Sequence, residues 1–590
     1  MNQETRQCQN CKQGFTIEPA DFAFYKGMKV PPPTWCPPCR MARRLSFRNE
    51  RVLYSRVCDL CGKRVISMYS PEAPFPVYCT ECWWGDRWDA SSFGRTYNFS
   101  RPFFEQFRNL FATVPRPALM AFMNVNSPYA NFIYKSKNSY LSSSVIESED
   151  ILYSWGADYS FFSTDCYQVS HSELCYQSIN IERCHRSSFL RYCKECVDSY
   201  FLYDCTNCHH CFLSSSLRNR EYVFKNKQCT KEEYLGKVNE YLGSFEAQER
   251  ARVEFQEMLQ KSIHRFAHIL NSPRSSGENI SYSKNTAYSF DVQKAEDVKF
   301  VFRAVDEKDS MDVFGGGPAA NHSYECISDG LGSAMLKFAS YSWENVMNLE
   351  YSDLCHSASY LFGCVGIRNK KYCVLNRRYS QEEYEKLIPK IIQHMNDMPY
   401  TDKKGKVYKY GEFFPLELSP FAYNETIAHE YFPLSKEWVI EQGLEWRDPE
   451  PRGYEVTIIS SQLPDHIKDV DDSILKETVG CVHQGTCGEQ CTTAFKIILQ
   501  ELEFYRKMVL PLPRLCPNCR HYKRLKQRNP LKLWHCKCQC AGSSDDRKIY
   551  QNIAPHFHGS DHCPNEFETS YAPGRPEVVY CEQCYRSEVV

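Results

Sequence analysis

The middle of the chain consists of short segments in which aromatic and apolar side chains alternate with serine, cysteine and acidic residues. Three of these segments align with one another, and each ends in a cysteine: DYSFFSTDC at Cys166, QSINIERC at Cys184 and DSYFLYDC at Cys205, with spacings of 18 and 21 residues. Short alternating strands repeated at about this length are typical of a β-solenoid, in which each coil packs on the next. The pattern therefore predicts a β-solenoid with stacked ladders of serine, tyrosine and cysteine.

A longer repeat overlies these segments. The sequence CTNCHHCFLSSSLRNREYVFKNKQCTKEEY, which begins at Cys205, resembles CHSASYLFGCVGIRNKKYCVLNRRYSQEEY, which begins 150 residues later. Both copies end in a capping-box sequence, Thr230-x-x-Glu233 and Ser380-x-x-Glu383, in which a hydroxyl and a carboxylate satisfy the first free amides of a helix. We therefore expect two solenoid halves, each of which ends in a helix.

Basic residues recur at helical spacing near both ends of the chain. The stretch CPPCRMARRLSFRN (36–49) returns as CPNCRHYKRLKQRN (516–529). After the second cysteine of each stretch, basic residues follow at intervals of three and four, which places them on one face if the segment is helical. The two basic faces comprise Arg40, Arg43, Arg44, Arg48 and Arg51, and then Arg520, Lys523, Arg524 and Arg528.

Length and composition narrow the class of protein. A chain of 590 residues is too long for a single hydrophobic core, so several domains are expected. The first residues, MNQETRQCQN, lack the apolar segment of a signal peptide, and no run of 18 apolar residues occurs, so we expect a cytoplasmic protein without a membrane partner. Thirty-two cysteines in such a chain indicate metal ligands and reduced thiols rather than disulfides. The formal net charge is −1, so a basic surface must be local.

The first hundred residues contain four Cys-x2-Cys pairs. Such a turn directs two thiolates at one tetrahedral ion, and a second turn completes a structural site with no open position. Pairing the turns in chain order predicts two zinc sites. Their ligands are Cys8, Cys11, Cys36 and Cys39, and then Cys58, Cys61, Cys79 and Cys82.

The C-terminal hundred residues repeat this module less regularly. The opening pair has three intervening residues, the third pair has become CKCQC, and 22 residues are inserted before the closing pair. The predicted ligands are Cys487, Cys491, Cys516 and Cys519, and then Cys538, Cys540, Cys581 and Cys584, so about four structural zinc ions are expected. The choice among Cys536, Cys538 and Cys540 stays open.

Two further groups of residues allow two interpretations each. The inserted HFHGSDHC is either a polar loop or part of a metal site that combines His556, His558, His562 and Cys563 with Cys536. The cysteines at positions 193, 196, 205, 208 and 211 either hold an iron–sulfur cluster or zinc, or form a ladder inside the solenoid. The segment 150 residues later favours the ladder, because it keeps Cys355 but has Ala358 and Leu361 in place of the next two cysteines.

These observations predict a multidomain protein, mainly β with helices, in which duplicated double zinc-ribbon or treble-clef modules flank a duplicated β-solenoid resembling a parallel β-helix. The treble clef fits because its second ligand pair opens a helix. The expected segments are a zinc-ribbon module at 1–98, a helical connector at 99–137, solenoid halves at 138–228 and 276–379 with a helical insert at 229–275 between them, a helix at 380–398, a Pro- and aromatic-rich connector at 399–478, and a second zinc-ribbon module at 479–590.

Several strings, including FPVYCTECWWGDRWD, FGCVGIRNKKYCVLNRRYSQEEYE and YGEFFPLELSPFAYNET, resemble a family of large zinc-ribbon proteins predicted in reduced-genome candidate-phyla bacteria. The resemblance spans nearly the whole chain. It implies a bacterial, cytoplasmic setting and the domain order given above, but it implies no activity and no catalytic residues.

Three functions are compatible with the sequence. The first is a nonenzymatic adaptor whose basic helices bind nucleic acid, with structured RNA or a ribonucleoprotein as the partner, because guanidinium groups contact phosphates without reading sequence. The second is a protein-binding scaffold whose basic helices form salt bridges within the protein or with an acidic partner and whose aromatic-rich solenoid surface is the recognition face. The third, a β-helix enzyme that cleaves polysaccharides, is less favoured, since no catalytic motif is evident: AHEYF lacks the second histidine of a metalloprotease and GGGP lacks the lysine of a phosphate loop.

Overall fold

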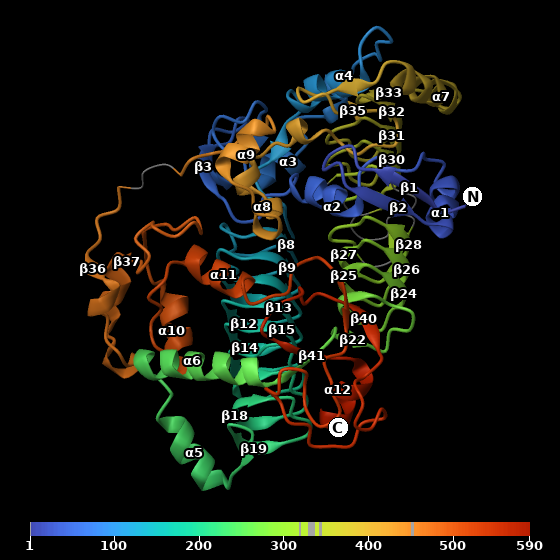
Figure 1. Ribbon diagram of the computed structural model, residues 1–590. Coiled ribbons are helices and arrows are strands. Elements are labelled where there is room, and N and C mark those ends of the chain that lie inside the picture. Colours follow the sequence, from blue (N-terminus) through green and yellow to red (C-terminus); the bar gives the residue numbers. More distant parts are fainter. Residues whose placement is uncertain are drawn as a thin grey trace. The chain divides into compact units, whose positions relative to one another are not determined.

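The computed structural model describes residues 2–317, 320–321, 323–327, 337–340, 345–449 and 453–589. The chain forms two compact units, and each unit combines two separate stretches of sequence (Figure 1). Unit 1 comprises residues 1–119 and 267–447, and unit 2 comprises residues 120–266 and 448–590. Each unit thus joins one cysteine-rich end of the chain to one half of the middle region.

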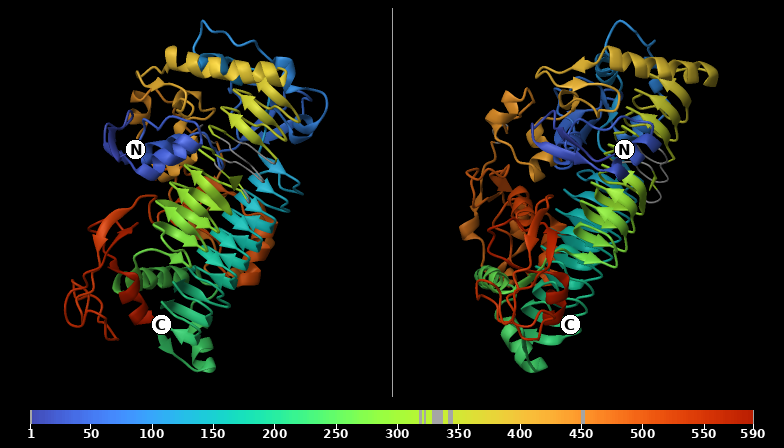
Figure 2. Two further views of the ribbon diagram at one scale, coloured as in Figure 1. Left: turned by 90° about the vertical axis from the view of Figure 1, so that its right-hand side faces the viewer. Right: turned by 45° about the vertical axis from the view of Figure 1, so that its right-hand side comes forward.

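Parallel strands occur in both halves of the middle region, as expected. We call residues 120–228 of unit 2 the first parallel stack and residues 269–378 of unit 1 the second parallel stack. Within each stack, strand follows strand in a regular ladder (Figure 2). Parallel partners are typically twelve residues apart: Glu149 lies opposite Phe161 in one sheet, and Trp155 lies opposite Tyr167 in the other.

The first parallel stack contains two sheets. One has the order β15 (Ile179–Glu182), β13 (Tyr167–Ser170), β11 (Trp155–Asp158), β9 (Ser143–Ile146), β8 (Asn131–Tyr134) and β7 (Ala121–Phe122). The other has the order β10 (Glu149–Leu152), β12 (Phe161–Thr164), β14 (Glu173–Tyr176), β16 (His185–Ser188), β17 (Tyr200–Tyr203), β18 (His209–Ser215), β19 (Glu221–Phe224) and β20 (Lys227–Gln228). All pairs are parallel except the last, β19–β20, which is an antiparallel hairpin.

The second parallel stack follows the same plan. Its strands are grouped as β22 (Ile269–Leu270), β23 (Gly277–Ser281), β25 (Ser289–Gln293) and β27 (Phe302–Val305), then β24 (Lys284–Ala287), β26 (Glu296–Lys299), β28 (Glu307–Met311) and β29 (Ala320–Asn321), and finally β30 (Met347–Glu350), β31 (Ser359–Phe362), β32 (Lys371–Val374) and β33 (Arg377–Arg378). It also ends in an antiparallel hairpin, β32–β33.

A step of three residues underlies the twelve-residue register. In the first parallel stack the residue before most inward-pointing residues has a left-handed backbone, as at Asp165 (φ 57°), Gln168 (φ 55°) and His171 (φ 49°). Residues other than glycine rarely adopt this backbone conformation, because their Cβ atom approaches the following carbonyl oxygen. Here it recurs regularly, and four such steps complete one register, so the ladder of backbone hydrogen bonds offsets the local cost.

The predicted repeat length is therefore wrong. Eighteen residues separate Cys166 from Cys184, which is one and a half registers of twelve. Two residues separated by any multiple of three both point into the stack. The spacings of 18 and 21 therefore reveal the three-residue step but not the twelve-residue register. The two cysteines both point into the stack, but they belong to different columns.

Serine and cysteine fill the interior of the first stack because they satisfy its backbone. The Ser154 hydroxyl donates to the Leu152 carbonyl (2.9 Å) and accepts from the Cys166 N–H (2.9 Å) twelve residues later. Buried polar groups are stable only when paired in this way. The apolar and thiol side chains of this core are Ala130, Ile133, Val145, Ile151, Ala157, Cys166, Val169, Cys175, Ile181, Cys184, Leu190, Cys193, Cys196, Leu202, Cys205, Cys208, Cys211 and Val223.

The five cysteines considered for an iron–sulfur cluster lie in this core. The Cys196 thiol donates to the Lys194 carbonyl (3.4 Å), and the Cys208 thiol donates to the Thr206 carbonyl (3.3 Å). Burial raises the pKa of Cys205 well above its usual range. A thiol that donates to a backbone carbonyl is protonated, unlike a cluster ligand, so the contacts of Cys196 and Cys208 agree with the ladder interpretation, although neighbouring thiols lower the pKa of Cys208.

Both stacks end in a capped helix, as predicted. The Thr230 hydroxyl and the Glu233 carboxylate form the capping box of α5 (Lys231–Asn239) in unit 2. Ser380 and Glu383 do the same for α7 (Gln381–Asp397) in unit 1. In unit 2 the longer helix α6 (Phe245–Lys261) packs on β17 and β18.

Each cysteine-rich end combines short hairpins with short helices. The N-terminal cysteine module (1–98) contains β1 (Glu4–Gln7), β2 (Gly14–Ile17), α1 (Pro19–Gly27), α2 (Pro37–Leu45), β3 (Tyr54–Val57), β4 (Arg64–Ser67), β5 (Val77–Tyr78) and α3 (Thr80–Trp84). The C-terminal cysteine module (479–590) contains β37 (Val479–Gly480), β38 (Ala494–Phe495), α10 (Leu499–Met508), α11 (Pro517–Leu525), β39 (Trp534–Lys537), β40 (Glu566–Thr569), β41 (Val578–Tyr580) and α12 (Glu582–Val589). The helices expected after Cys39 and Cys519 are α2 and α11.

The remaining segments are short elements packed within their own unit. In unit 1 they include α4 (Phe103–Phe111), β6 (Arg116–Pro117), β34 (Tyr400–Thr401), β35 (Val407–Tyr408), α8 (Ile427–Tyr431) and α9 (Lys436–Glu441), and in unit 2 they include β21 (Ile263–Arg265), which pairs with β41, and β36 (Ile458–Ile459), which pairs with β37. Among the described residues, no helix has the length and apolar character needed to cross a membrane.

Candidate metal centres and their arginine clusters

The first two predicted metal sites converge as expected. The sulfurs of Cys8, Cys11, Cys36 and Cys39 form one group, and those of Cys58, Cys61, Cys79 and Cys82 form another, with all donor atoms of each group within 4.8 Å of one another. With Zn–S bonds of about 2.3 Å, tetrahedral coordination places sulfurs about 3.8 Å apart. The sulfur–sulfur distances, 3.7 Å for Cys11–Cys36 and 3.9 Å for Cys61–Cys79, agree with a zinc ion.

Local secondary structure positions these sulfurs. Cys36 is the N-cap of α2, so Cys39 projects from the first helical turn beside it. The Cys36 N–H donates to the Cys8 sulfur (3.2 Å), and the Cys79 N–H, at the N-cap of α3, donates to the Cys58 sulfur (3.2 Å). Amide donors at a helix N-terminus stabilise negative charge on sulfur, which favours the thiolate form needed for metal binding.

The third site differs from the prediction in one ligand. The grouped sulfurs are those of Cys481, Cys491, Cys516 and Cys519, whereas Cys487 had been predicted in place of Cys481. The Cys516 N–H donates to the Cys481 sulfur (3.3 Å), as the equivalent N–H does in the N-terminal module. Sequence spacing favoured Cys487, but the β37–β38 pair brings the more distant Cys481 to the site. The Cys487 sulfur lies 3.6 Å from that of Cys519.

Two serine variants test this assignment. Cys481→Ser should lower the zinc content by about one ion per chain, because a buried hydroxyl replaces one of four thiolates. Cys487→Ser should leave the content unchanged, and it serves as the matched control. Elemental mass spectrometry of the purified full chain measures both, and a loss of zinc only in Cys487→Ser would contradict the assignment.

The fourth site also uses an unexpected cysteine. The sulfur grouped with those of Cys538, Cys581 and Cys584 is that of Cys563, whereas Cys540 had been predicted. The Cys563–Cys581 separation of 3.8 Å matches that of Cys61–Cys79 in the N-terminal module. The inserted segment therefore supplies a ligand in place of the lost Cys-x2-Cys turn.

Cys540 belongs to a further group, with His556, His558 and Cys584. The interpretation of HFHGSDHC as part of a metal site thus agrees with the geometry for His556, His558 and Cys563. The other two residues have different contacts: the His562 side chain lies 2.8 Å from Asp546, and the Cys536 sulfur lies 4.0 Å from the Tyr571 carbonyl oxygen.

The arginines beside the first site form ion pairs inside unit 1. Arg40 and Arg44 both donate to the Asp312 carboxylate, at 3.0 Å and 2.9 Å. Arg43 makes two bonds to Glu325 (2.9 and 2.8 Å) and one to Glu412 (3.1 Å). Asp312 and Glu325 belong to the second parallel stack. The α2 helix therefore docks on that stack through its basic face.

Unit 2 repeats this arrangement with the residues 480 positions later. Arg524 donates to one oxygen of Asp165 (2.6 Å), and Arg520 lies 3.2 Å from the other. Arg520 also donates to Glu501 (3.0 Å) and to the Tyr505 hydroxyl oxygen (2.9 Å). Asp165 belongs to the first parallel stack and corresponds to Asp312, since each carboxylate forms ion pairs with both arginines that the two modules share.

These contacts do not fit the prediction that the two basic faces form a nucleic-acid surface. Six of its nine residues are at most 4% exposed: Arg40, Arg43, Arg44, Arg48, Arg520 and Arg524. Arg51 lies 3.6 Å from Glu430, the Arg528 guanidinium lies over the Tyr167 ring (4.0 Å), and the exposed Lys523 lies 3.9 Å from Glu249. A phosphate backbone needs accessible cations, whereas these six are covered by the carboxylates and aromatic rings of the adjacent stack. The alternative of internal salt bridges agrees with the structure.

Burying these ion pairs costs desolvation free energy. Burial raises the pKa of the Glu325 carboxyl, and the Arg43 guanidinium opposes that shift. Replacing such a pair by apolar residues is often neutral, whereas removing one partner leaves a buried charge uncompensated. Loss of one partner should therefore cost much more stability than the intact pair contributes.

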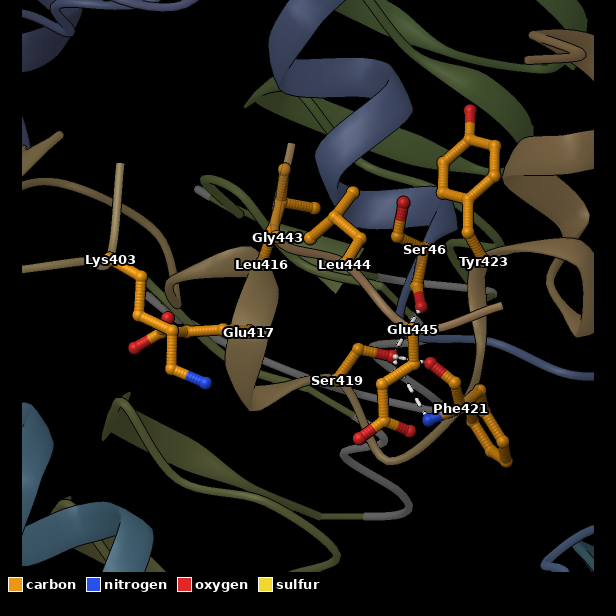
Figure 3. Close-up of a pocket in the computed structure, with 10 residues that line it drawn as sticks. All are labelled: Ser46, Lys403, Leu416, Glu417, Ser419, Phe421, Tyr423, Gly443, Leu444 and Glu445. Atoms are coloured by element: carbon orange, nitrogen blue, oxygen red, sulfur yellow. Dashed lines mark hydrogen bonds between the residues drawn. The ribbon is translucent and has the colours of Figure 1, made fainter. Parts of the chain in front are cut away.

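Figure 3 shows a small pocket in unit 1 lined by Ser46, Lys403, Leu416, Glu417, Ser419, Phe421, Tyr423, Gly443, Leu444 and Glu445. Its volume is about 80 Å³. Sites for small-molecule substrates usually have roughly 300–1,000 Å³. The Ser419 hydroxyl is already bonded to the Ser46 carbonyl oxygen (2.7 Å), so this pocket is not a candidate active site.

No protein-family model matches the chain, and no curated protein matches it.

Proposed function

We propose that this protein is a nonenzymatic, zinc-stabilised scaffold that binds a protein partner on the surface of a β-solenoid. In this proposal the two parallel stacks are solenoid halves, and the cysteine modules are zinc-ribbon or treble-clef domains that cap them. The twelve-residue register and the grouped thiolates support this description. A cytoplasmic, reducing setting fits, because none of the cysteines in the described part of the chain forms a disulfide.

The observation that carries the proposal is a run of exposed aromatic residues in the first parallel stack. Tyr159, Phe161 and Phe162 are 45%, 44% and 41% exposed, and Ile146 is 37% exposed. Three large aromatic side chains exposed within four residues cost solvation free energy in a free protein, and such patches mark interaction surfaces. We call these four residues the aromatic patch.

Charged ladders flank the aromatic patch. Lys135 lies 3.5 Å from Glu147, and Lys137 pairs with Glu149, twelve residues further along in each case. Phe161 lies between Glu149 and Glu173 in its sheet. An apolar centre with a polar, charged rim is typical of a protein–protein interface, where the rim excludes water and sets orientation.

The buried arginines of α2 and α11 also favour the scaffold over the nucleic-acid adaptor. The adaptor hypothesis needs the basic faces of α2 and α11 for phosphate contacts, and six of those side chains are already paired or covered inside their own units. The scaffold hypothesis needs only that they hold each cysteine module on its stack.

A triple variant tests the scaffold. Tyr159→Ser, Phe161→Ser and Phe162→Ser together should abolish binding of the partner, because the aromatic anchors of an interface contribute most of its binding free energy. The matched control is Val253→Ser on α6, which replaces another exposed apolar residue (59%) of unit 2. Partners captured by the wild type are purified and titrated against all three proteins by calorimetry.

The same preparations are titrated with labelled structured RNA at low and moderate salt. Salt-sensitive RNA binding that is equal in the wild type and the triple variant, without a protein partner that distinguishes them, would contradict the scaffold and favour a nucleic-acid adaptor. Circular dichroism and zinc content confirm that each variant is folded.

A further inference from the structure

Seven metal-binding side chains converge in the C-terminal cysteine module. Two of the groups of four found there have one residue in common: Cys538, Cys563, Cys581 and Cys584 form the first, and Cys540, His556, His558 and Cys584 form the second. Each set of four donor atoms lies within 4.8 Å of one another. We propose that this module holds two metal ions, most simply two zinc ions, bridged by the Cys584 thiolate.

The distances around Cys584 fit a bridge. Its sulfur lies 3.6 Å from that of Cys563 in the first group and 3.3 Å from His558 Nε2 in the second. Within the second group, the Cys540 sulfur lies 3.4 Å from His556 Nδ1. Bonds of about 2.3 Å to sulfur and 2.0–2.1 Å to nitrogen predict S–N edges of about 3.6 Å in a tetrahedron. The measured edges of both sets thus agree with those of a tetrahedral site.

The second nitrogen of each histidine is occupied in the way that metal ligands require. His556 Nε2 lies 2.9 Å from a carboxylate oxygen of Glu588, and His558 Nδ1 lies 2.6 Å from the Asp561 carbonyl oxygen. Both acceptors demand a proton on the nitrogen that faces them. The lone pair therefore stays on Nδ1 of His556 and on Nε2 of His558, which are the nitrogens that face the sulfurs. Such outer partners are typical of zinc-bound histidine.

Glu588 is buried beside this site and is held in place by hydrogen bonds from the chain. Its side chain is 0% exposed, and besides His556 it accepts from the Tyr550 hydroxyl (2.9 Å) and the Ile553 N–H (2.9 Å). A buried carboxylate with donors from the chain itself orients the imidazole before any metal binds. We assign Glu588 as a positioning residue for the second ion.

Charge balance also favours two ions. Five cysteines contribute to the two groups, and Cys538, Cys540, Cys563, Cys581 and Cys584 are all buried. One divalent ion would leave several buried thiolates or force them to stay protonated, whereas two divalent ions balance four of five negative charges. The Asn552 amide donates to the Cys540 sulfur (3.3 Å), and the Asn565 amide donates to the Cys581 sulfur (3.3 Å), which disperses the remaining charge.

Metal stoichiometry of the full chain gives the first test. Two sites in the N-terminal module, one at Cys481, Cys491, Cys516 and Cys519, and two at the bridged centre predict five zinc ions per chain, against four without the bridge. Cys540→Ser and His558→Gln should each lower the content from five to four. His562→Gln is the matched control, because His562 lies in the same insert but contacts Asp546, and it should keep five.

Cadmium substitution of the wild type tests the bridge without any variant. With ¹¹³Cd in every site, two resonances should split each other through the shared sulfur, and one of them should show a mixed sulfur–nitrogen environment.

Glu588→Gln should keep the same ligands but release cadmium from that second position first during competition with a chelator. Four ions per wild-type chain, or five uncoupled resonances, would overturn the proposal.

Discussion

Removal of zinc from the full chain should unfold both cysteine modules while the parallel stacks keep their strands. The modules consist of hairpins of four residues or fewer per strand and short helices, so little of their structure is stable without the ions. Structural zinc contributes about 10–16 kcal/mol per site in zinc-finger peptides. The stacks have their own buried cores and should lose less.

Tryptophan fluorescence reports this loss in the N-terminal module, as a change in the summed emission of the chain's nine tryptophans. Trp35 and Trp83 are 0% and 2% exposed and adjoin the ligands Cys36 and Cys82. Chelation should shift their emission to longer wavelength, and zinc but not magnesium should reverse the shift, because magnesium binds oxygen rather than sulfur. Far-ultraviolet circular dichroism follows the strands of the stacks in the same sample. An unchanged emission after complete removal of metal would contradict a structural role.

Asp312→Asn should destabilise unit 1 by about 3–5 kcal/mol, because it leaves Arg40 and Arg44 buried without a full countercharge. Asp165→Asn should do the same to unit 2 through Arg520 and Arg524. Both changes preserve side-chain volume, so the loss reports on charge rather than on packing. Chemical denaturation followed by hydrogen exchange assigns each loss to its unit.

Glu105→Gln is the matched control for these variants. It removes the carboxylate of an exposed pair with Arg101, whose side chains are 33% and 45% exposed, so stability should change by less than about 1 kcal/mol. Zinc content should stay at the wild-type value in all three variants, because none of the changed residues is a ligand. If Asp312→Asn were as stable as Glu105→Gln, the basic face of α2 would be free for an external partner.

Local sequence determined the features that depend on neighbouring residues. The Cys-x2-Cys turns place two sulfurs together within four residues, so the first two sites could be predicted in full. The helix after Cys39 and the capping box at Ser380 depend on one or two turns of backbone, and both occur as expected. The three-residue step left its signature in the spacings of 18 and 21, although the register of twelve did not follow from them.

Only the tertiary structure decided the features that depend on distant residues. Cys481 replaces Cys487, and Cys563 replaces Cys540, because a strand pair and an inserted loop bring them closer than their spacing indicates. A basic helical face has the same sequence whether phosphate, solvent or a carboxylate covers it. The residue that covers Arg40 is Asp312, 272 positions away, and hydrophobic or charge patterns along the chain carry no information about that partner. The sequence therefore determined which chemistry was present, and tertiary contacts decided where it is used.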